Sequence, residues 1–504
     1  MLKKIDKYLF SRHPQPRLQG AWNCAQVGFF IFPWFPALGA VGVGFALIGT
    51  WWQDYRRIIQ RPLNWGLGIL SLWLIFSATQ AYNSTEAFLG LANFLPFFAF
   101  LAAFSSLIKT PAQLRRLAWI LVIPSVLVVI LGFGQLFLGW AHPPQFPALL
   151  GWVLEAKGNP PGRMASVFMY ANILAAYLQI VFTLGLGLWI EMFQAWREQR
   201  AGGAEGAGGA GGAGEAGGDE GDGGAEGAGG AGGAGGAGGV GAGLTDNLWR
   251  QTDNLTKPAL LGEAGGVLLF LTGVEIANAI AIILTHSRNA WGGVIVVGLA
   301  FALYQGWRWL VGIVVAAAGA VLGAAFSPSP LRDGLRMIVP AYFWARLTDQ
   351  LHPDRPVALM RITQWRFALS LTQQRPWTGW GLRNFTPLYE QQMDLWLGHP
   401  HNLILMLAAE TGIPATILFC GLVGWIFWQG VLWINQARSR LNGDRLIVFS
   451  YLVAFGGCIL FNMLDVTLFD LRVNTLGWLL LSAIAGVAAS KPDNNKLEPL
   501  TNDE

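Results

Sequence analysis

Long apolar runs, separated by short polar or basic segments, make up most of this chain. Because a helix needs about 20 apolar residues to cross a bilayer, the runs predict an all-α, polytopic membrane protein with about 12 transmembrane helices. A long extracytoplasmic segment is expected between spans 9 and 10. The expected spans are 20–34, 36–52, 63–80, 86–107, 117–139, 166–190, 265–286, 289–304, 309–326, 402–434, 446–466 and 473–490.

The first apolar run, 20–52, permits two interpretations because Pro33 and Pro36 interrupt it. It could form one kinked helix or a tight helical hairpin of two spans. Basic loops favour the cytoplasmic side of a membrane. With twelve spans, the basic N-terminus and three short basic loops share that side, and the loop QAYNSTE, which has no Lys or Arg, falls outside. The basic residues are Lys3, Lys4, Lys7, Arg12, Arg17, Arg56, Arg57, Arg61, Lys109, Arg115, Arg116, Arg438, Arg440 and Arg445.

Twelve spans place both termini in the cytoplasm, whereas a single span over 20–52 would invert every later loop. The basic N-terminus has no apolar segment followed by a cleavage site, so we expect a retained cytoplasmic tail. The expected organisation is 1–19 as that tail, 20–193 as spans 1–6, 194–260 as a cytoplasmic insert, 261–326 as spans 7–9, 327–401 as an outer loop, 402–490 as spans 10–12 and 491–504 as a second cytoplasmic tail.

Three segments between the spans have compositions of their own. Residues 140–165 are expected to form a Pro-rich outer loop. The stretch LMRITQWRFALSLTQQ within 327–401 is amphipathic, and we expect it to lie on the membrane surface or to cap a cavity. Residues 201–243 are almost entirely Gly and Ala, with six acidic residues and no Lys or Arg. Such a segment cannot bury enough apolar surface to offset its backbone entropy, which predicts a disordered linker.

Composition supports the membrane class. Only 12% of the residues are charged, whereas soluble domains have about 25%, and the chain holds 24 Trp and 31 Phe. The net charge of +4 does not indicate nucleic-acid binding, because the basic residues lie mostly in short loops. Cys24, Cys420 and Cys458 all fall in apolar runs, so we expect small buried hydrophobic residues and neither a disulfide nor a metal framework.

A few polar residues fall at the outer ends of the expected spans. They are Arg163 before span 6, Arg288 between spans 7 and 8, and His399, His401 and Asn402 where span 10 begins. Guanidinium groups bind phosphate oxygens bidentately and stay charged, and a histidine can exchange a proton near neutral pH. Two arginines and a histidine therefore suit a lipid-linked phosphate or diphosphate substrate.

Each of these residues also has a simpler interpretation. An arginine at a helix end can be a snorkelling anchor, and a histidine at a helix start can contact headgroups or loop carbonyls. Glu275 and Glu410 fall well inside spans, where ionisable groups are costly and point to function unless they are hydrogen-bonded structural carboxyls. Glu275 together with Asn278 would suit transport of a small anion.

Four segments resemble the O-antigen ligase family, which also contains O-antigen polymerases and pilin O-oligosaccharyltransferases. HNLILMLAAETGIP is similar to the His-Asn, Leu, Glu-x-Gly pattern of the family, and THSRNAWGG to its Ser-Arg-Gly-Ala-Trp segment. RPWTGWGLRNF matches Pro-x-x-Gly-x-Gly followed by Phe, and RMASVFMYANILAAYL resembles Arg…Asn-x-x-Ala. The pattern covers roughly 160–470, and the twelve-span layout suits the whole chain.

The resemblance implies metal-independent glycosyl transfer, without a cofactor, at the periplasmic face of a bacterial inner membrane. The donor would be a glycan on undecaprenyl diphosphate, and the acceptor a hydroxyl of a glycan, lipid or protein. Arg163 and Arg288 would hold the diphosphate, and His401 would assist the attacking hydroxyl. Asn402 and Glu410 would shape the start of that helix. His399 completes the supporting residues.

The sequence departs from the family at two positions and leaves alternatives open. Asn289 stands where the family usually has Gly, although Asn is a good helix cap. Ala165 replaces a common Gly and restricts the backbone slightly. The chain is also similar to a cyanobacterial branch that carries the label of inorganic-carbon transporter. An O-antigen polymerase and a transporter of a small anion such as bicarbonate therefore stand as alternatives to the ligase.

Overall fold

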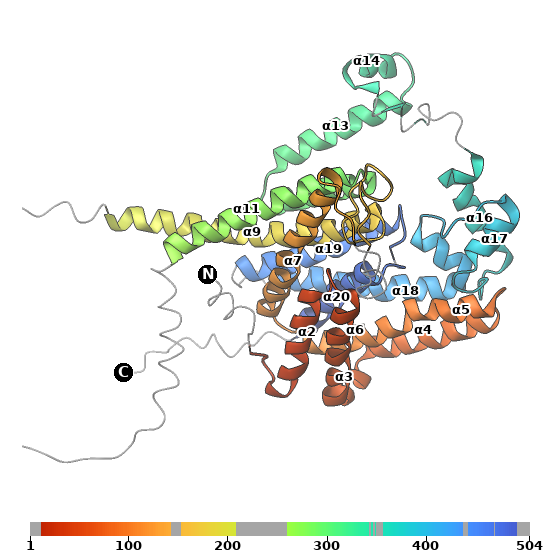
Figure 1. Ribbon diagram of the computed structural model, residues 1–504, viewed down its shortest axis with the longest axis horizontal. Helices are drawn as coiled ribbons and strands as arrows, with labels where there is room; N and C mark the ends of the chain where they lie inside the picture. The colour runs from red at the N-terminus through yellow and green to blue at the C-terminus, as the bar shows by residue number, and fades with distance from the viewer. Residues whose placement is uncertain are drawn as a thin grey trace, which may run out of the picture. The chain divides into compact units, whose positions relative to one another are not determined.

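The computed structural model shows an all-α arrangement in the part of the chain that it describes. That part comprises 12–142, 153–207, 260–341, 344–345, 348, 356–436, 442–467 and 469–490, with the backbone alone at 199–207, 260–264 and 442. The helices (Figure 1) are η1 Pro16–Leu18, α2 Gln19–Ile31, α3 Pro36–Gln60, α4 Pro62–Thr79, α5 Ser84–Gly90, η2 Leu91–Asn93, α6 Leu95–Leu107, α7 Pro111–Phe137, α9 Ala171–Ala207, α11 Leu260–Leu284, α12 Arg288–Tyr304, α13 Arg308–Phe326, α14 Leu331–Ile338, η3 Val357–Leu359, α16 Arg361–Gln374, α17 Phe385–Met393, α18 Leu403–Gln436, α19 Asn442–Asn462 and α20 Leu471–Ala489.

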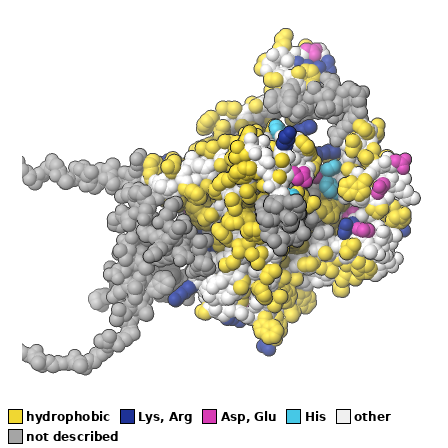
Figure 2. Space-filling model, viewed as in Figure 1, with side chains coloured by type: hydrophobic (Ala, Val, Ile, Leu, Met, Phe, Trp, Pro, Cys, Tyr) yellow, Lys and Arg dark blue, Asp and Glu magenta, His cyan; other side chains and the backbone are white. Residues whose placement is uncertain are grey.

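Nine helical segments within the described ranges are long and apolar enough to cross a membrane, so the chain is a multi-pass membrane protein. Hydrophobic side chains accordingly cover much of the described face in Figure 2, where histidine side chains lie in the upper right of the body and charged side chains appear there and at the edges. The nine segments coincide with nine of the twelve expected spans. The expected spans 20–34, 36–52 and 289–304 stay predictions, because α2 has only 13 residues, α12 has 17, and α3 carries charges at its end.

Helices α2 and α3 form a hairpin, which decides between the two interpretations of the first apolar run. Gly28 packs directly against the backbone of Val43, so a Cβ atom at position 28 would clash with that backbone. At the open end, Arg17 bonds the Asp54 carboxylate at 2.7 Å, and the ring of His13 bonds the Leu107 carbonyl at 2.8 Å. The beginning of α2 therefore lies beside the ends of α3 and α6, as a hairpin requires.

Basic loops that are distant in sequence meet at one end of the bundle. Asp54 is buried and pairs with Arg17 and, at 3.8 Å, with Arg57. Elsewhere at the helix ends, Arg115 pairs with Asp444 at 2.8 Å and so joins the beginning of α7 to the start of α19. The cytoplasmic location of these loops stays a prediction. Arg438 and Arg440 lie outside the described residues.

The described residues belong to two compact units, Met1–Gly187 with Val274–Glu504, and Leu188–Gly273. In the second unit, the Trp189 indole N–H donates to the Thr272 hydroxyl at 2.8 Å, so the parts of α9 and α11 that belong to it are in contact. Helix α9 continues to Ala207, seven residues into the stretch expected to be a disordered linker. Alanine propagates a helix well, which gives a reason for this extension. Residues 208–259 lie outside the described part.

The amphipathic stretch of the outer segment forms α16, which packs against α18. Phe367 and Leu371 on its inner face join Phe385 and Tyr389 of α17 and Ala409 of α18 in a buried apolar cluster. Ile362 and Leu369 on its other face are about half exposed. The stretch is therefore an integral layer over the beginning of α18.

Two glycines allow the segment that contains α16 and α17 to approach α18 closely. Gly412 has a φ of 82° and interrupts α18 two residues before Pro414. Gly379 has a φ of 66° and lies against the backbone of Glu410. Glycine tolerates such φ values, and a side chain at Gly379 would clash with α18. The Pro-x-x-Gly-x-Gly segment, residues 376–381, thus allows α16 and α17 to pack against the kinked helix α18.

Candidate functional site

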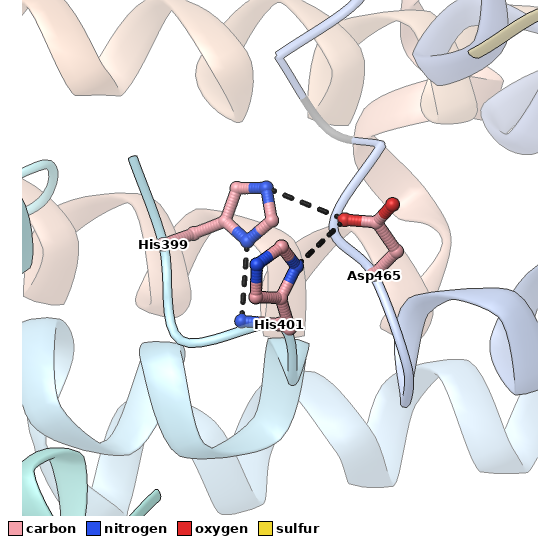
Figure 3. A group of neighbouring side chains, drawn as sticks. All are labelled: His399, His401 and Asp465. Atoms are coloured by element: carbon pink, nitrogen blue, oxygen red, sulfur yellow. Dashed lines mark hydrogen bonds and ion pairs between the residues drawn. The ribbon is translucent and has the colours of Figure 1, made fainter. Parts of the chain in front are cut away.

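A histidine and an aspartate form the centre of the candidate site (Figure 3). His401 lies in the loop before α18, and Asp465 lies in the loop between α19 and α20. His401 Nδ1 is 3.0 Å from Asp465 Oδ1, which also accepts the Val466 backbone N–H at 3.0 Å. The φ of His401 is 53°, an uncommon value for a residue other than glycine. Uncommon backbone conformations of this kind concentrate at functional sites.

The Asp465 carboxylate is buried yet ionised. Burial raises its pKa, but the hydrogen bond from His401, the two neighbouring histidines and the hydrogen bond from Asn172 together hold the pKa below its ordinary value. An ionised carboxylate only accepts hydrogen bonds, so Nδ1 of His401 must carry the proton. In the neutral imidazole, Nε2 then keeps its lone pair. The His401 side chain is 31% exposed, so that nitrogen can be reached by a ligand.

His399 has a different role from His401 because both of its ring nitrogens face protein groups. Its Nδ1 accepts the backbone N–H of His401 at 3.1 Å, and its Nε2 is 3.5 Å from Asp465 Oδ1. Burial lowers the pKa of His399 to about 4, against the opposing effect of Asp465, so the ring is neutral at pH 7. The side chain therefore holds the backbone of His401 in place.

The same three side chains have the spacing of a metal site. The ligand atoms of His399, His401 and Asp465 lie within 4.8 Å of one another. A metal needs a lone pair on each ligating nitrogen. Because Nδ1 of neutral His399 accepts a hydrogen bond, its proton is on Nε2, the nitrogen that faces Asp465. In this arrangement His399 offers no lone pair on that side, so the group does not fit a three-ligand metal site.

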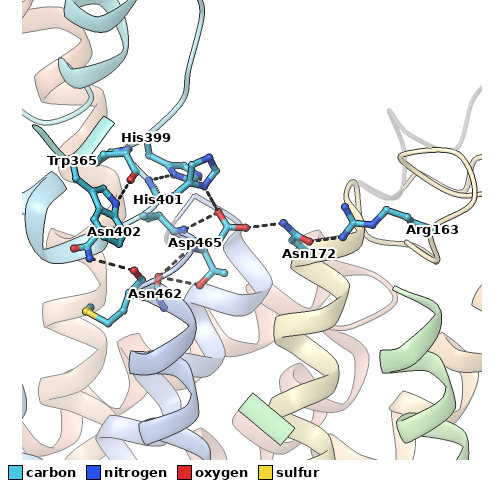
Figure 4. Close-up of polar contacts among 12 residues, drawn as sticks. Arg163, Asn172, Trp365, His399, His401, Asn402, Asn462 and Asp465 are labelled. Carbon is cyan, nitrogen blue, oxygen red and sulfur yellow. Dashed lines mark hydrogen bonds and ion pairs between the residues drawn. The ribbon is translucent and has the colours of Figure 1, made fainter. Parts of the chain in front are cut away.

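Arg163 is connected to the same centre through Asn172 (Figure 4). The guanidinium donates through Nε to the Thr285 carbonyl at 2.7 Å and through Nη2 to Asn172 Oδ1 at 2.6 Å. The Asn172 amide then donates to Asp465 Oδ2 at 2.8 Å. One polar chain therefore runs from Arg163 to His401. The structure brings together these two residues, which the sequence placed at the outer ends of different spans.

Arg288 is close in sequence to this chain of contacts but takes no part in it. It is the first residue of α12 and follows Thr285, the acceptor of Arg163, by three positions. The backbone of Met164 also bonds the Leu284 carbonyl at 2.9 Å, which fixes the two loops side by side. Arg288 is exposed, and its guanidinium has no hydrogen-bond or ion-pair partner among the described residues. It is thus available for a ligand.

Asn402 caps the beginning of α18. Its Oδ1 accepts the backbone N–H of Leu405 at 3.0 Å, as an N-cap does. Its Nδ2 donates to the Met463 carbonyl at 3.2 Å. The loop that carries Asp465 is therefore attached to the helix start that carries His401.

Glu410 does not shape that helix start, and this expectation was wrong. Its Oε1 accepts the backbone N–H of Phe385 at 3.2 Å, at the beginning of α17, and the residue is only 2% exposed. The physical reason is the close packing of the 379–385 segment against α18. The 379–385 segment lies against the helix at Glu410, so the nearest unpaired donors are those of α17.

Two residues of the network were not singled out from the sequence. Asn172 lies in the quoted segment RMASVFMYANILAAYL, so its position in the Arg…Asn pattern was the available signal. Asp465 falls at the end of an apolar run, and nothing in that run connects it with His401. Glu275, by contrast, is buried against Gly185, and its carboxyl has no partner among the described residues.

The comparisons with known proteins agree with the geometry. Residues 274–420 match the family model described as O-antigen ligase. The match contains Arg288, His399, His401, Asn402 and Glu410, whereas Arg163 and Asn172 precede the matched residues and Asp465 follows them. No curated protein matches the chain. The resemblance seen in the motifs is thereby confirmed, since residues 274–420 of this membrane protein match the O-antigen ligase family model.

Proposed function

We propose that this protein moves a glycan from undecaprenyl diphosphate to an acceptor hydroxyl at the periplasmic face of a bacterial inner membrane. The single observation that carries the proposal is the His401–Asp465 pair, which leaves one imidazole nitrogen exposed with its lone pair. The O-antigen ligase domain supports the same class of reaction. His401 is the catalytic residue in this proposal, and Asp465 positions it.

The proton transfer follows from the tautomer of His401. Nε2 accepts the proton of the acceptor hydroxyl while the hydroxyl oxygen attacks the anomeric carbon of the donor glycan. Asp465 stabilises the imidazolium that forms, because its carboxylate accepts the hydrogen bond from Nδ1. General base catalysis of this kind contributes about 10²–10⁴ to a rate. His399 cannot replace His401, since both of its nitrogens face protein groups.

Bond breaking is assigned to the arginine side of the site. As the new glycosidic bond forms, the bond from the anomeric carbon to the diphosphate oxygen breaks, and its electron pair goes to undecaprenyl diphosphate. Arg288 and the Nη1 group of Arg163 then bind the diphosphate oxygens. Preorganised cations of this kind stabilise developing negative charge strongly. Nε and Nη2 of Arg163 are used by Thr285 and Asn172, which fix its orientation.

The sidedness of the reaction rests on the loop charges. Arg17 and Arg57 pair with Asp54 beside the end of α6, and Arg115 at the beginning of α7 pairs with Asp444 at the start of α19. The positive-inside rule assigns such loops to the cytoplasm. The candidate site lies at the other ends of the same spans, before α18 and after α19, which corresponds to the periplasm. Ligase and polymerase share the donor chemistry, and the acceptor distinguishes them.

A reconstituted transfer assay tests the proposal. Purified protein in lipid nanodiscs is given a glycan linked to undecaprenyl diphosphate and a panel of lipid, glycan and protein acceptors. We expect transfer by the wild type and a loss of about 10²-fold or more in His401→Ala. Arg332→Ala, which removes an exposed arginine of α14, serves as a control that keeps full transfer.

The outcomes separate the alternatives. The acceptor that works decides between ligase and polymerase. Full activity of His401→Ala would contradict the proposed mechanism. Absence of transfer with every acceptor, from protein that unfolds cooperatively, would remove the proposal and favour anion transport.

A further inference from the structure

Helices α18, α19 and α20 and the beginning of α9 enclose an apolar cavity of about 320 Å³. Its walls are mainly aromatic and aliphatic, and they include Leu407, Phe419, Phe427, Phe455 and Trp478. All four helices contain segments long and apolar enough to span a membrane. The cavity therefore lies among the membrane-spanning helices and suits a hydrocarbon chain.

One end of the cavity adjoins the candidate site. Met463 and Thr467 line it, and they lie two residues before and after Asp465. Leu403 lines it from α18, two residues after His401. The hydrogen bond from Asn402 to the Met463 carbonyl joins these two walls. A molecule with its polar group at His401 and Asp465 can thus extend an apolar tail directly into the cavity.

Two polar residues of the lining differ in their contacts. Gln179 has a buried side-chain oxygen without a hydrogen-bond partner among the described residues, and this side chain lies against Gly293. Asn462 Oδ1 accepts the backbone N–H of Thr467 at 3.0 Å, and its Nδ2 donates to the Cys458 carbonyl at 2.9 Å. The amide is therefore used within the loop. Since the lining is mainly aromatic and aliphatic, the cavity favours an occupant that is apolar over most of its length. Ile404 and Ile459 are 42% and 37% exposed, so the cavity has a side from which a lipid chain can enter.

We infer that this cavity holds the isoprene units that lie next to the diphosphate of the donor lipid. The inference rests on the proposed function, because the diphosphate is placed there by Arg163 and Arg288. A phospholipid acyl chain is the competing occupant. Nothing fixes the head group of a phospholipid at His401. The polyprenyl chain, in contrast, is covalently attached to the diphosphate that binds at the candidate site.

Glycines of the cavity wall offer a sharp test. Gly424 of α18 lines the cavity, and open space surrounds the position where its Cβ would stand. The Cβ of a phenylalanine there meets no described protein atom within 4 Å, and the ring would take up space beside the cavity wall. Gly421 lies on the same helix, has open space as well and does not line the cavity. Gly421→Phe is therefore a matched control for Gly424→Phe.

The experiment measures donor binding and transfer for both variants in nanodiscs. The probes are radiolabelled undecaprenyl diphosphate without a glycan, and two glycan donors, one with the full polyprenyl chain and one with only a few isoprene units. Gly424→Phe should raise the dissociation constant of the probe and the KM for the long-chain donor by about tenfold or more, with little change in kcat, because uniform binding is lost. The short-chain donor and Gly421→Phe should show much smaller effects.

The results separate failure of the inference from failure of the proposed function. Transfer by the wild type together with unchanged binding and KM in Gly424→Phe would overturn the inference alone, and would assign the cavity to phospholipid. Polyprenyl diphosphate binding that Gly424→Phe weakens, without transfer by the wild type, would keep the cavity assignment and remove the transferase.

Discussion

Two buried carboxylates close to the beginning of α18 differ in their hydrogen-bond partners. Asp465 is 8% exposed and Glu410 is 2% exposed. Asp465 bonds the side chains of His401 and Asn172, whereas Glu410 bonds the backbone N–H of Phe385. The first carboxylate controls the protonation of a group that a ligand can reach. The second closes the start of a helix, so burial of a carboxyl does not by itself indicate chemistry.

The largest expected effect separates these two carboxylates in the transfer assay. Asp465→Asn removes the charge that fixes the His401 tautomer and stabilises its imidazolium, so transfer should fall by about 10²-fold or more. Glu410→Gln keeps an oxygen that accepts the Phe385 N–H, so transfer should stay within about threefold of the wild type. Equal losses in both variants would show that the two carboxylates do not differ in role.

A second comparison concerns the two arginines. Arg163 bonds Thr285 and Asn172, so Arg163→Ala should lose transfer and also about 1.5–3 kcal/mol of stability. Arg288 has no partner among the described residues, so Arg288→Ala should lose donor affinity with a stability change within about 0.5 kcal/mol. Thermal unfolding in detergent and donor binding measure the two quantities. A large stability loss in Arg288→Ala would contradict its assignment as a free ligand group.

The smallest expected effect concerns the pH dependence of stability at His399. Its pKa in the folded protein is about 4, below the ordinary value of 6.5, so between these values the unfolded chain binds more protons than the folded one. The stability from neutral His399 is present above pH 6.5 and declines as the pH falls toward 4. At pH 5 the loss should be about 2 kcal/mol.

His399→Gln isolates this contribution, because glutamine keeps an acceptor for the His401 N–H and does not titrate. The variant should show a smaller drop in unfolding temperature between pH 7.5 and 5 than the wild type. The same pH dependence in both proteins would assign the acid sensitivity to other groups. In either case His401 is unchanged, so transfer at pH 7.5 reports whether His399 also positions the base.

The sequence predicted the membrane class and most of the helix positions because hydrophobic length is a local property. Nine expected spans coincide with helices that meet the length and hydropathy of a span. The hairpin at 20–52 was favoured by loop charges, since each span reverses the side of the next loop. Contacts between Arg17 and Asp54 and between His13 and Leu107 then showed the hairpin directly.

By itself, the sequence determined which segments enter the membrane, which residues bear charge at their ends and which family the motifs resemble. Only the tertiary structure decided that Asp465 and Asn172 connect His401 with Arg163, and that Glu410 serves α17. The physical reason is the distance along the chain over which each property acts. Hydropathy and loop charge act through neighbouring residues, whereas a hydrogen-bonded network depends on which helix ends packing brings within about 3 Å of one another.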